Sequence, residues 1–167
     1  MTSATAELPV SERIAASVFL RLQKISAGYA SSSPSILVWR PTQQGGFIPN
    51  DYQLIVTQGD MTHNQALSHM GNPPAKAWVL PFIISGLSQP SEHDPTAIDT
   101  LKNVFAADVT RCLCDADDWH TWDQMAIDST IGNVQNIPSA DGGISGFKLT
   151  LTILFRTDET NPYNVRA

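Results

Sequence analysis

The stretch that decides the fold is FKLTLTILFR, residues 147–156, near the end of the chain. Apolar side chains occupy every odd position from Phe147 to Phe155, while Lys148, Thr150 and Thr152 occupy even positions. Because successive side chains of a strand point to opposite faces, this alternation predicts a strand with one apolar and one polar face. Such a strand belongs to a sheet that is covered on one side only. The polar segment after it, which contains Pro162, ends the strand.

Two helices are predicted upstream of this strand. The first begins at Ser11, which we interpret as its N-cap, and stops at Gly28. The second begins at Asp94 and Pro95, a cap followed by a proline in the first turn. Helical spacing joins the apolar residues of each face: Ile14, Val18, Leu22 and Ile25 in the first, and Ile98, Leu101, Phe105, Val109 and Cys112 in the second.

Four further segments are predicted as strands, namely residues 36–40, 52–57, 77–88 and 125–137. Pro81 indicates an edge position or a bulge in the third of them. Residues 59–76 are polar and rich in turn-forming residues, so we predict a long loop with a helical turn around residues 65–69. No internal sequence repeat is evident.

The order of these elements predicts an α+β fold, with a mostly antiparallel sheet of about five strands flanked by two main helices. We expect a flexible arm over residues 1–10, a single domain over residues 11–157 and a tail over residues 158–167.

The composition argues against several classes of function. Ten basic and 16 acidic residues give a net charge of −6, which argues against sequence-independent binding of nucleic acid. The N-terminus lacks the pattern of a signal peptide, and no apolar run reaches the ~18 residues of a membrane span. Cys112 and Cys114 are too close together to bond to each other, which favours reduced thiols and a cytoplasmic folding compartment.

Residues 112–120 hold the densest set of side chains able to bind metal, but their spacing matches neither a zinc nor a calcium site. The four histidines belong to no recognised catalytic motif. Trp119 and Trp122 could stack a sugar or base, although packing at a corner between helix and strand is the commoner role. We therefore predict no catalytic residues, no metal and no cofactor. The alternatives are a ligand-binding module that uses the two tryptophans and a metal-dependent hydrolase that uses His120.

Several motifs occur together in an order that resembles the tail-terminator and minor tail proteins of long-tailed bacteriophages. They are the first helix with WRP at residues 39–41, GNPPAKAW at 71–78, the second helix leading to WHTWD at 119–123, and FRTD at 155–158 with NPY at 161–163. The resemblance covers residues 10–166. It implies a non-enzymatic virion protein that forms a ring, commonly sixfold, caps the tail tube, ends its polymerisation and offers the surface to which the head docks.

The partners implied by the resemblance are further copies of this chain, the tail tube protein and a head-completion or neck protein, with DNA passing through the lumen. It implies assembly in the bacterial cytoplasm and a place in the virion near the head–tail junction, or alternatively a head-to-tail joining protein. Family members contact their neighbours through loops and tails. By position, the assembly contacts would be His63, Asn64, His69, Asn72, Arg156, Asp158, Pro162, Tyr163 and Arg166.

Overall fold

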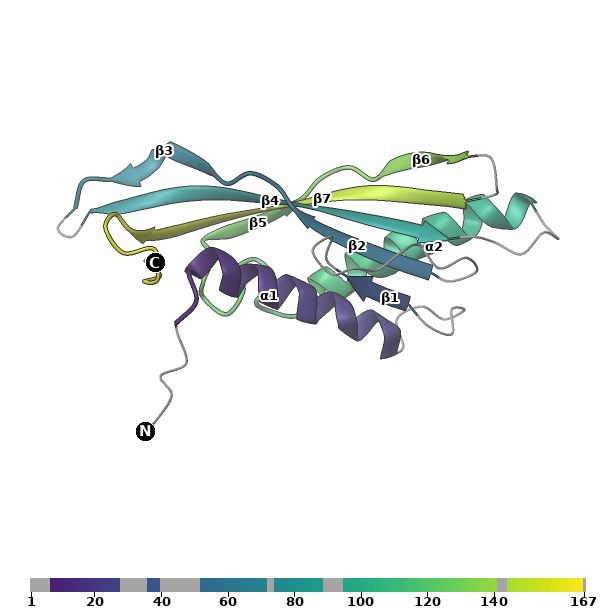
Figure 1. Cartoon of the computed structure of the whole chain (residues 1–167), viewed down its shortest axis with the longest axis horizontal. Coiled ribbons are helices and arrows are strands. Elements are labelled where there is room, and N and C mark those ends of the chain that lie inside the picture. Colours follow the sequence, from purple (N-terminus) through teal and green to yellow (C-terminus); the bar gives the residue numbers. More distant parts are fainter. Residues whose placement is uncertain are drawn as a thin grey trace.

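One sheet with two helices on one of its faces makes up the protein (Figure 1). This computed structural model describes residues 7–27, 36–39, 52–71, 74–88, 95–140 and 144–166. Both helices lie beneath the sheet in the view of Figure 1, and no helix of the described residues lies on the opposite face. The predicted α+β class is therefore confirmed.

The helices are α1 (Val10–Gln23), continued by the 3₁₀ turn η1 (Lys24–Ala27), and α2 (Pro95–Cys114). The strands are β1 (Ile36–Trp39), β2 (Tyr52–Gln58), β3 (Thr62–His69), β4 (Ala75–Ser88), β5 (Asp128–Ile131), β6 (Gln135–Ala140) and β7 (Ile144–Asp158). Their order is β1-β2-β4-β7-β5, with β3 added to β4 and β6 added to β7. All neighbours are antiparallel except β1 and β2.

The two longest strands, β4 and β7, form the centre of the sheet and pair over their whole lengths. The outer edge of β4 is shared by β2 and β3, and the outer edge of β7 is shared by β5 and β6. The two halves have a similar order of elements, a helix followed by an interrupted edge strand and a long strand, and β1 is an addition to the first half (Figure 1). The likeness lies in the order of the elements and not in the sequence, which shows no repeat.

The core confirms the alternation that predicted β7. Its odd-numbered residues from Phe147 to Phe155 are at most 1% exposed. They share the helix-covered face with Leu80, Phe82 and Ile84, their neighbours on β4. Full burial of a side chain of this size contributes about 1.5–3 kcal/mol. The apolar face of β7 is therefore a principal source of the stability of the fold.

Two predicted elements were wrong. Residues 62–69 form strand β3, where we expected a loop with a helical turn. This strand escaped prediction because most of its side chains are exposed, so it shows no apolar periodicity. The segment predicted as one strand, 125–137, contains β5 and the start of β6, separated by residues 132–134. This division and the unpredicted β3 explain why the sheet has seven strands and not about five.

Pro81 lies within β4, an internal strand, and not at an edge. Its carbonyl accepts a hydrogen bond of 2.8 Å from the backbone N–H of Gly59, at the point where the neighbouring edge passes from β2 to β3. In an antiparallel strand the N–H and C=O of a residue face the same neighbour. The missing N–H of Pro81 therefore faces this break, where the regular hydrogen bonding is already interrupted.

The first helix begins one residue before the predicted N-cap. Pro9 precedes it and no side chain caps it, so the predicted role of Ser11 was wrong. The backbone N–H of Val10 instead donates to the carbonyl of Pro162 in the C-terminal tail at 3.1 Å. The predicted stop at Gly28 and the predicted cap at Asp94 lie outside the described residues.

Candidate assembly surface

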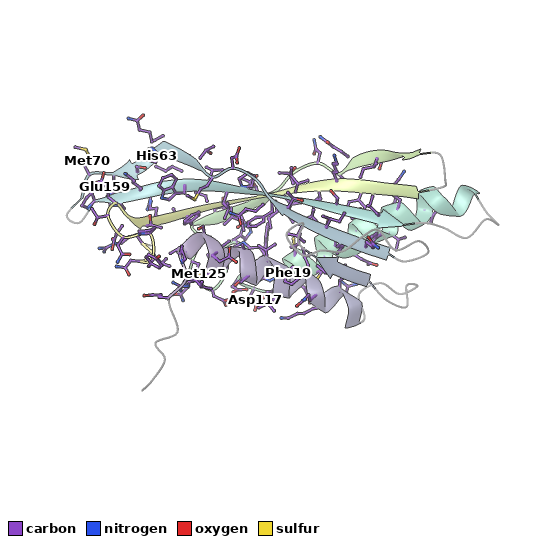
Figure 2. The ribbon with its side chains drawn as sticks, in the orientation of Figure 1. Phe19, His63, Met70, Asp117, Met125 and Glu159 are labelled. Carbon is purple, nitrogen blue, oxygen red and sulfur yellow. The ribbon has the colours of Figure 1, made fainter. Side chains whose placement is uncertain are left out.

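One end of the sheet gathers segments that are far apart in the sequence. It consists of β3, the start of β4, the end of β7 and the C-terminal residues 159–166, and we call it the wing end (Figures 1 and 2). In Figure 2 the labelled residues His63, Met70 and Glu159 all lie at this end of the molecule. Sheet register brings these segments together, because β4 pairs with β3 on one side and with β7 on the other.

Side chains hold the irregular middle of β3 in place. The pairing with β4 slips between Asn64 and His69, and Ser68 fills the gap. Its Oγ accepts the N–H of Ala77 at 3.0 Å and donates to the carbonyl of Asn64 at 2.8 Å. The hydroxyl proton is then committed, so Nε2 of His63, 2.9 Å from this oxygen, must be the donor of that bond. These hydrogen bonds give the middle of β3 a defined structure within the wing end.

Trp78 connects the wing to the core. Its Nε1 donates to Oγ1 of Thr157 at 3.1 Å, and its ring lies 5.4 Å from that of His63 between ring centres. On the other side of the wing, Nε of Arg156 donates to the carbonyl of Leu67 at 3.1 Å. These contacts hold β3 against β4 and β7.

The C-terminal tail folds back onto the protein. Thr157 pairs with Val165, and the N–H of Arg166 donates to the carbonyl of Arg156. The guanidinium of Arg166 and the amide of Asn164 both bind the carboxylate of Asp158. The tail also reaches the start of α1, because the carbonyl of Pro162 accepts the N–H of Val10.

The contact between Asp158 and Arg166 predicts that the stability of the folded-back tail depends on pH. Hydrogen bonds from Arg166 and then Asn164 lower the pKa of Asp158 below its ordinary value. A carboxyl group with a lowered folded-state pKa stabilises the fold at neutral pH, and this contribution is lost as the pH falls through that pKa, below about 4. We expect an NMR titration to show a lowered midpoint for Asp158 and a higher one in Arg166→Gln. Equal midpoints in the two proteins would contradict the contact.

The structure brings together eight of the nine residues that we assigned to assembly, and their role stays a prediction. Asn72 lies outside the described residues. Several of the eight also have partners within the chain, as described above for His63, Asn64, Arg156, Asp158 and Arg166. The four that are most exposed are His63, His69, Pro162 and Tyr163.

Sequence reasoning missed the apolar side chains of the wing. Met70 is 99% exposed at the tip, and Met61 and Leu67 are 42% and 40% exposed. Figure 2 shows Met70 projecting from the far end of the molecule. The only signal in the sequence was three large apolar residues within an otherwise polar segment. Met61 and Met70 flank β3 and Leu67 lies within it, so exposed apolar side chains are spread along this strand.

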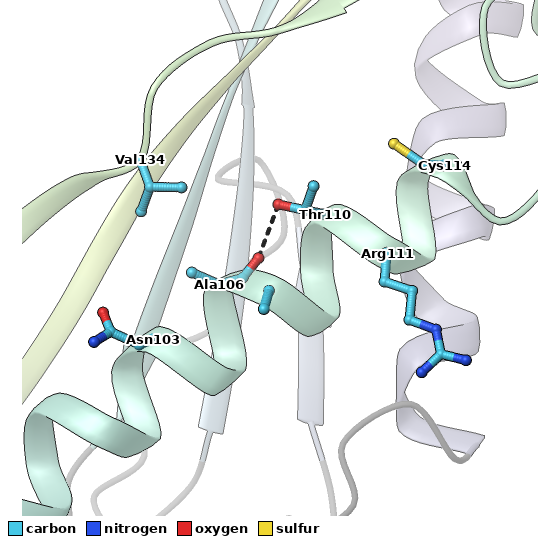
Figure 3. Close-up of a pocket in the computed structure, with 7 residues that line it drawn as sticks. Asn103, Ala106, Thr110, Arg111, Cys114 and Val134 are labelled. Atoms are coloured by element: carbon cyan, nitrogen blue, oxygen red, sulfur yellow. Dashed lines mark hydrogen bonds between the residues drawn. The ribbon is translucent and has the colours of Figure 1, made fainter.

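A groove lies in the other half of the molecule, between α2 and the connection from β5 to β6 (Figure 3). Its volume is about 460 Å³. The wall on α2 presents mainly small side chains, and Val134 faces them across the gap. The lining residues are Asn103, Ala106, Ala107, Thr110, Arg111, Cys114 and Val134.

The turn between α2 and β5 has an uncommon backbone. Trp122, Asp123 and Gln124 have φ values of 48°, 58° and 65°, in the left-handed region that side chains disfavour. Trp122 compensates for this strain because it is fully buried and its Nε1 donates to Oγ of Ser129 at 2.7 Å. The guanidinium of Arg21 lies 4.1 Å from the centre of the Trp122 ring.

Arg21 also ties this turn to α1. One of its nitrogens lies 3.1 Å from Oδ1 of Asp118. Burial by itself raises the pKa of Asp118, but the backbone hydrogen bond from Asp123 and the charge of Arg21 outweigh it, so the pKa is lowered. The carboxylate is therefore the form that holds the turn.

These contacts bear on the alternative functions. Trp122 is fully buried and cannot stack a ligand, so the predicted binding module would retain only Trp119, whose ring lies 3.6 Å from that of His120. Within the described residues no group of three or more His, Cys, Asp or Glu side chains could hold a metal ion. Cys112 and Cys114 are both free in the structure.

Comparison with known proteins assigns this chain to no family. No family model and no curated protein matches this sequence. Among the described residues no helix is long and apolar enough to cross a membrane.

Proposed function

We propose that this chain is a structural protein of a long-tailed bacteriophage, which assembles with its own copies into a ring that caps the tail tube. The ring ends tube polymerisation and offers the surface on which the head docks. The sequence resemblance described above is the first support. Identical subunits joined head to tail close into such a ring when the rotation between neighbours permits it.

The wing end is the observation that carries the proposal. It holds eight of the residues that the resemblance assigns to assembly by position, and β3 and its two flanking positions carry the exposed side chains of Met61, Leu67 and Met70. These three stand apart from the buried core and their burial would require a partner. The mostly exposed strand β3 suits contact with a neighbouring subunit.

The test is the mass of the purified protein in solution, by light scattering over a concentration series, with negative-stain images of the same sample. We expect closed rings of uniform size. Addition of the sample to growing tail tubes of the same phage should give tubes of limited length with one capped end.

The outcomes separate the possible roles. Rings that bind tube ends support the proposal. Binding to heads without any effect on tube length would replace it by the head-to-tail joining role. A monomer that binds neither tubes nor heads would refute both.

A further inference from the structure

We propose that the C-terminal tail is exchanged between copies of this chain, so that residues 162–166 of one copy bind the end of β7 and the start of α1 in its neighbour. In the structure the same residues occupy that place in their own chain. This inference deepens the proposed function and rests on it only for the presence of a neighbouring copy. It predicts that each subunit of the ring is joined to the next by a paired segment of backbone as well as by surface contacts.

The end of β7 has an edge that only the tail fills among the described residues. On one side β4 pairs with β7 along its whole length, but on the other side the pairing with β5 ends at Leu154. Beyond that residue, Thr157 pairs with Val165 of the tail, and the N–H of Arg166 donates to the carbonyl of Arg156 at 3.1 Å. The tail thus takes the position of a missing strand (Figure 1). An unpaired strand edge readily accepts another strand.

The tail is attached mainly by polar contacts near the surface. Val165 packs against the core, whereas Tyr163 is 40% exposed. Arg166 and Asn164 bind the carboxylate of Asp158, and the side chain of Arg166 is still 39% exposed. Ion pairs at a surface contribute little net stability. Detachment of the tail would therefore leave the core of the subunit folded.

The structure identifies the occupant of this edge. Every surface that the tail contacts is present in identical form on each copy, so the tail of a neighbour fits it without any new complementarity. Two of these surfaces are the carbonyl of Arg156 on β7 and the N–H of Val10 on α1, which donates to the carbonyl of Pro162. The charge pairing is kept as well, because Arg166 of one copy would meet Asp158 of the next.

The link between β7 and the tail decides which copy the tail reaches. It consists of residues 159–161, in which Glu159 and Thr160 are exposed and Oδ1 of Asn161 accepts the N–H of Tyr163 at 3.1 Å. When extended, such a link spans at most about 11 Å, so the tail reaches only a subunit in direct contact. A short link favours exchange. Within a ring the neighbour is held at a high local concentration, so pairing between copies competes with pairing within one copy.

Cysteines at a paired position report the chain to which the bound tail belongs. Thr157 and Val165 lie opposite each other. The Cα atoms of such a pair are about 4.5–5.5 Å apart, within the range of a disulfide. Thr157→Cys and Val165→Cys are made as two separate proteins, one of them isotopically labelled, then refolded together and mildly oxidised. We expect covalent dimers that contain one chain of each variant, identified by mass and removed by reducing agent.

Matched proteins control for the native thiols and for the register. Cys114, which is partly exposed, is replaced by serine in every variant, whereas Cys112 is buried and burial raises its pKa to about 11. Each single variant refolded alone should give no covalent dimer. A chain that carries both Thr157→Cys and Val165→Cys must form the bond whether or not the tail is exchanged. Absence of the bond in that protein would overturn the pairing itself.

The outcomes separate the exchange from the proposed function. Rings in which the doubly substituted chains are linked to their neighbours support both. Rings in which every bond lies within one chain overturn the exchange and leave the proposed function intact. Mixed dimers without rings support the exchange and count against the ring. A monomer with the bond inside its own chain overturns both.

The length of the link tests the exchange without oxidation. Deletion of Thr160 and Asn161 prevents the tail from folding back onto its own chain, so self-association should strengthen roughly tenfold or more. Insertion of a flexible Gly/Ser segment after Thr160 lets the tail close within its own chain, and association should weaken. The same insertion after Gly132, in the exposed connection between β5 and β6, is the control and should leave association unchanged. Equal association of the shortened and lengthened proteins would refute the exchange.

Discussion

Replacement of Trp122 by alanine is expected to lower the free energy of unfolding by about 3–5 kcal/mol, the usual cost of removing a large buried aromatic side chain. The ring is fully buried and contacts the guanidinium of Arg21 on one face. Its removal would leave a cavity at the point where α1, α2 and the turn before β5 meet. It would also remove the support for three consecutive residues in the left-handed region.

Thermal denaturation followed by circular dichroism measures this effect. For a domain of this length the melting temperature should fall by roughly 10 °C. Trp119→Ala is the matched control, because Trp119 is only partly buried and its ring stacks on the exposed His120. We expect that control to cost about 1 kcal/mol or less. Similar losses in the two variants would contradict the anchoring role of Trp122.

A third variant separates the packing of Trp122 from its hydrogen bond. Trp122→Phe keeps much of the buried ring but removes the bond to Ser129, which we expect to cost about 1–2 kcal/mol. Ser129 keeps its own donor bond to the carbonyl of His120, so its hydroxyl does not become isolated. A loss as large as that of the alanine variant would mean that the hydrogen bond, and not packing, dominates.

The elements that sequence reasoning predicted well are those with one buried face. Strand β7 and helix α1 were found because burial imposes a period of two on the strand and of 3.6 on the helix. In α1 the residues Val10, Ile14, Val18 and Leu22 are all fully buried. An apolar period appears in the sequence because only one face of each of these elements is buried.

Strand β3 could not be predicted for the same reason. Its side chains are mostly exposed, so no period distinguishes them, and it is a strand because its backbone pairs with β4. The turn at residues 122–124 was equally hidden, since left-handed φ values at Trp, Asp and Gln contradict local preference. Tertiary contacts of Trp122 and Arg21 impose that conformation, and a single sequence does not show them.

The assembly role of the candidate site stays a prediction, and the structure shows only where its residues lie. Residues of β3, of the end of β7 and of the tail were assigned to one role from their positions in the chain, and the sheet places them at one end. Their proximity follows from the strand order, in which β4 lies between β3 and β7. The groove was not foreseen, because it depends on how α2 lies against the β5–β6 connection.

Replacement of Gly86 by alanine is the second change for which we expect a large loss of stability. A Cβ atom at this position would lie 2.2 Å and 2.5 Å from two carbon atoms of the Phe147 ring. That ring is fully buried and meets the ring of Phe105 edge to face, with 5.3 Å between the ring centres. It has little freedom to move away, and overpacking of a core of this kind costs about 1–3 kcal/mol or more.

Chemical denaturation of three variants tests this explanation. Gly132→Ala is the control, because a Cβ there would meet its nearest atom, the carbonyl oxygen of Thr150, at an ordinary distance of 3.4 Å. Phe147→Leu creates space over Gly86, so the Gly86→Ala/Phe147→Leu double variant should lose less stability than the sum of the two single changes. Additive losses would show that the cost arises in the backbone of β4 and not from the collision with Phe147. The non-additivity expected here would identify the contact between Gly86 and Phe147 as a place where the close fit of β4 and β7 depends on a glycine.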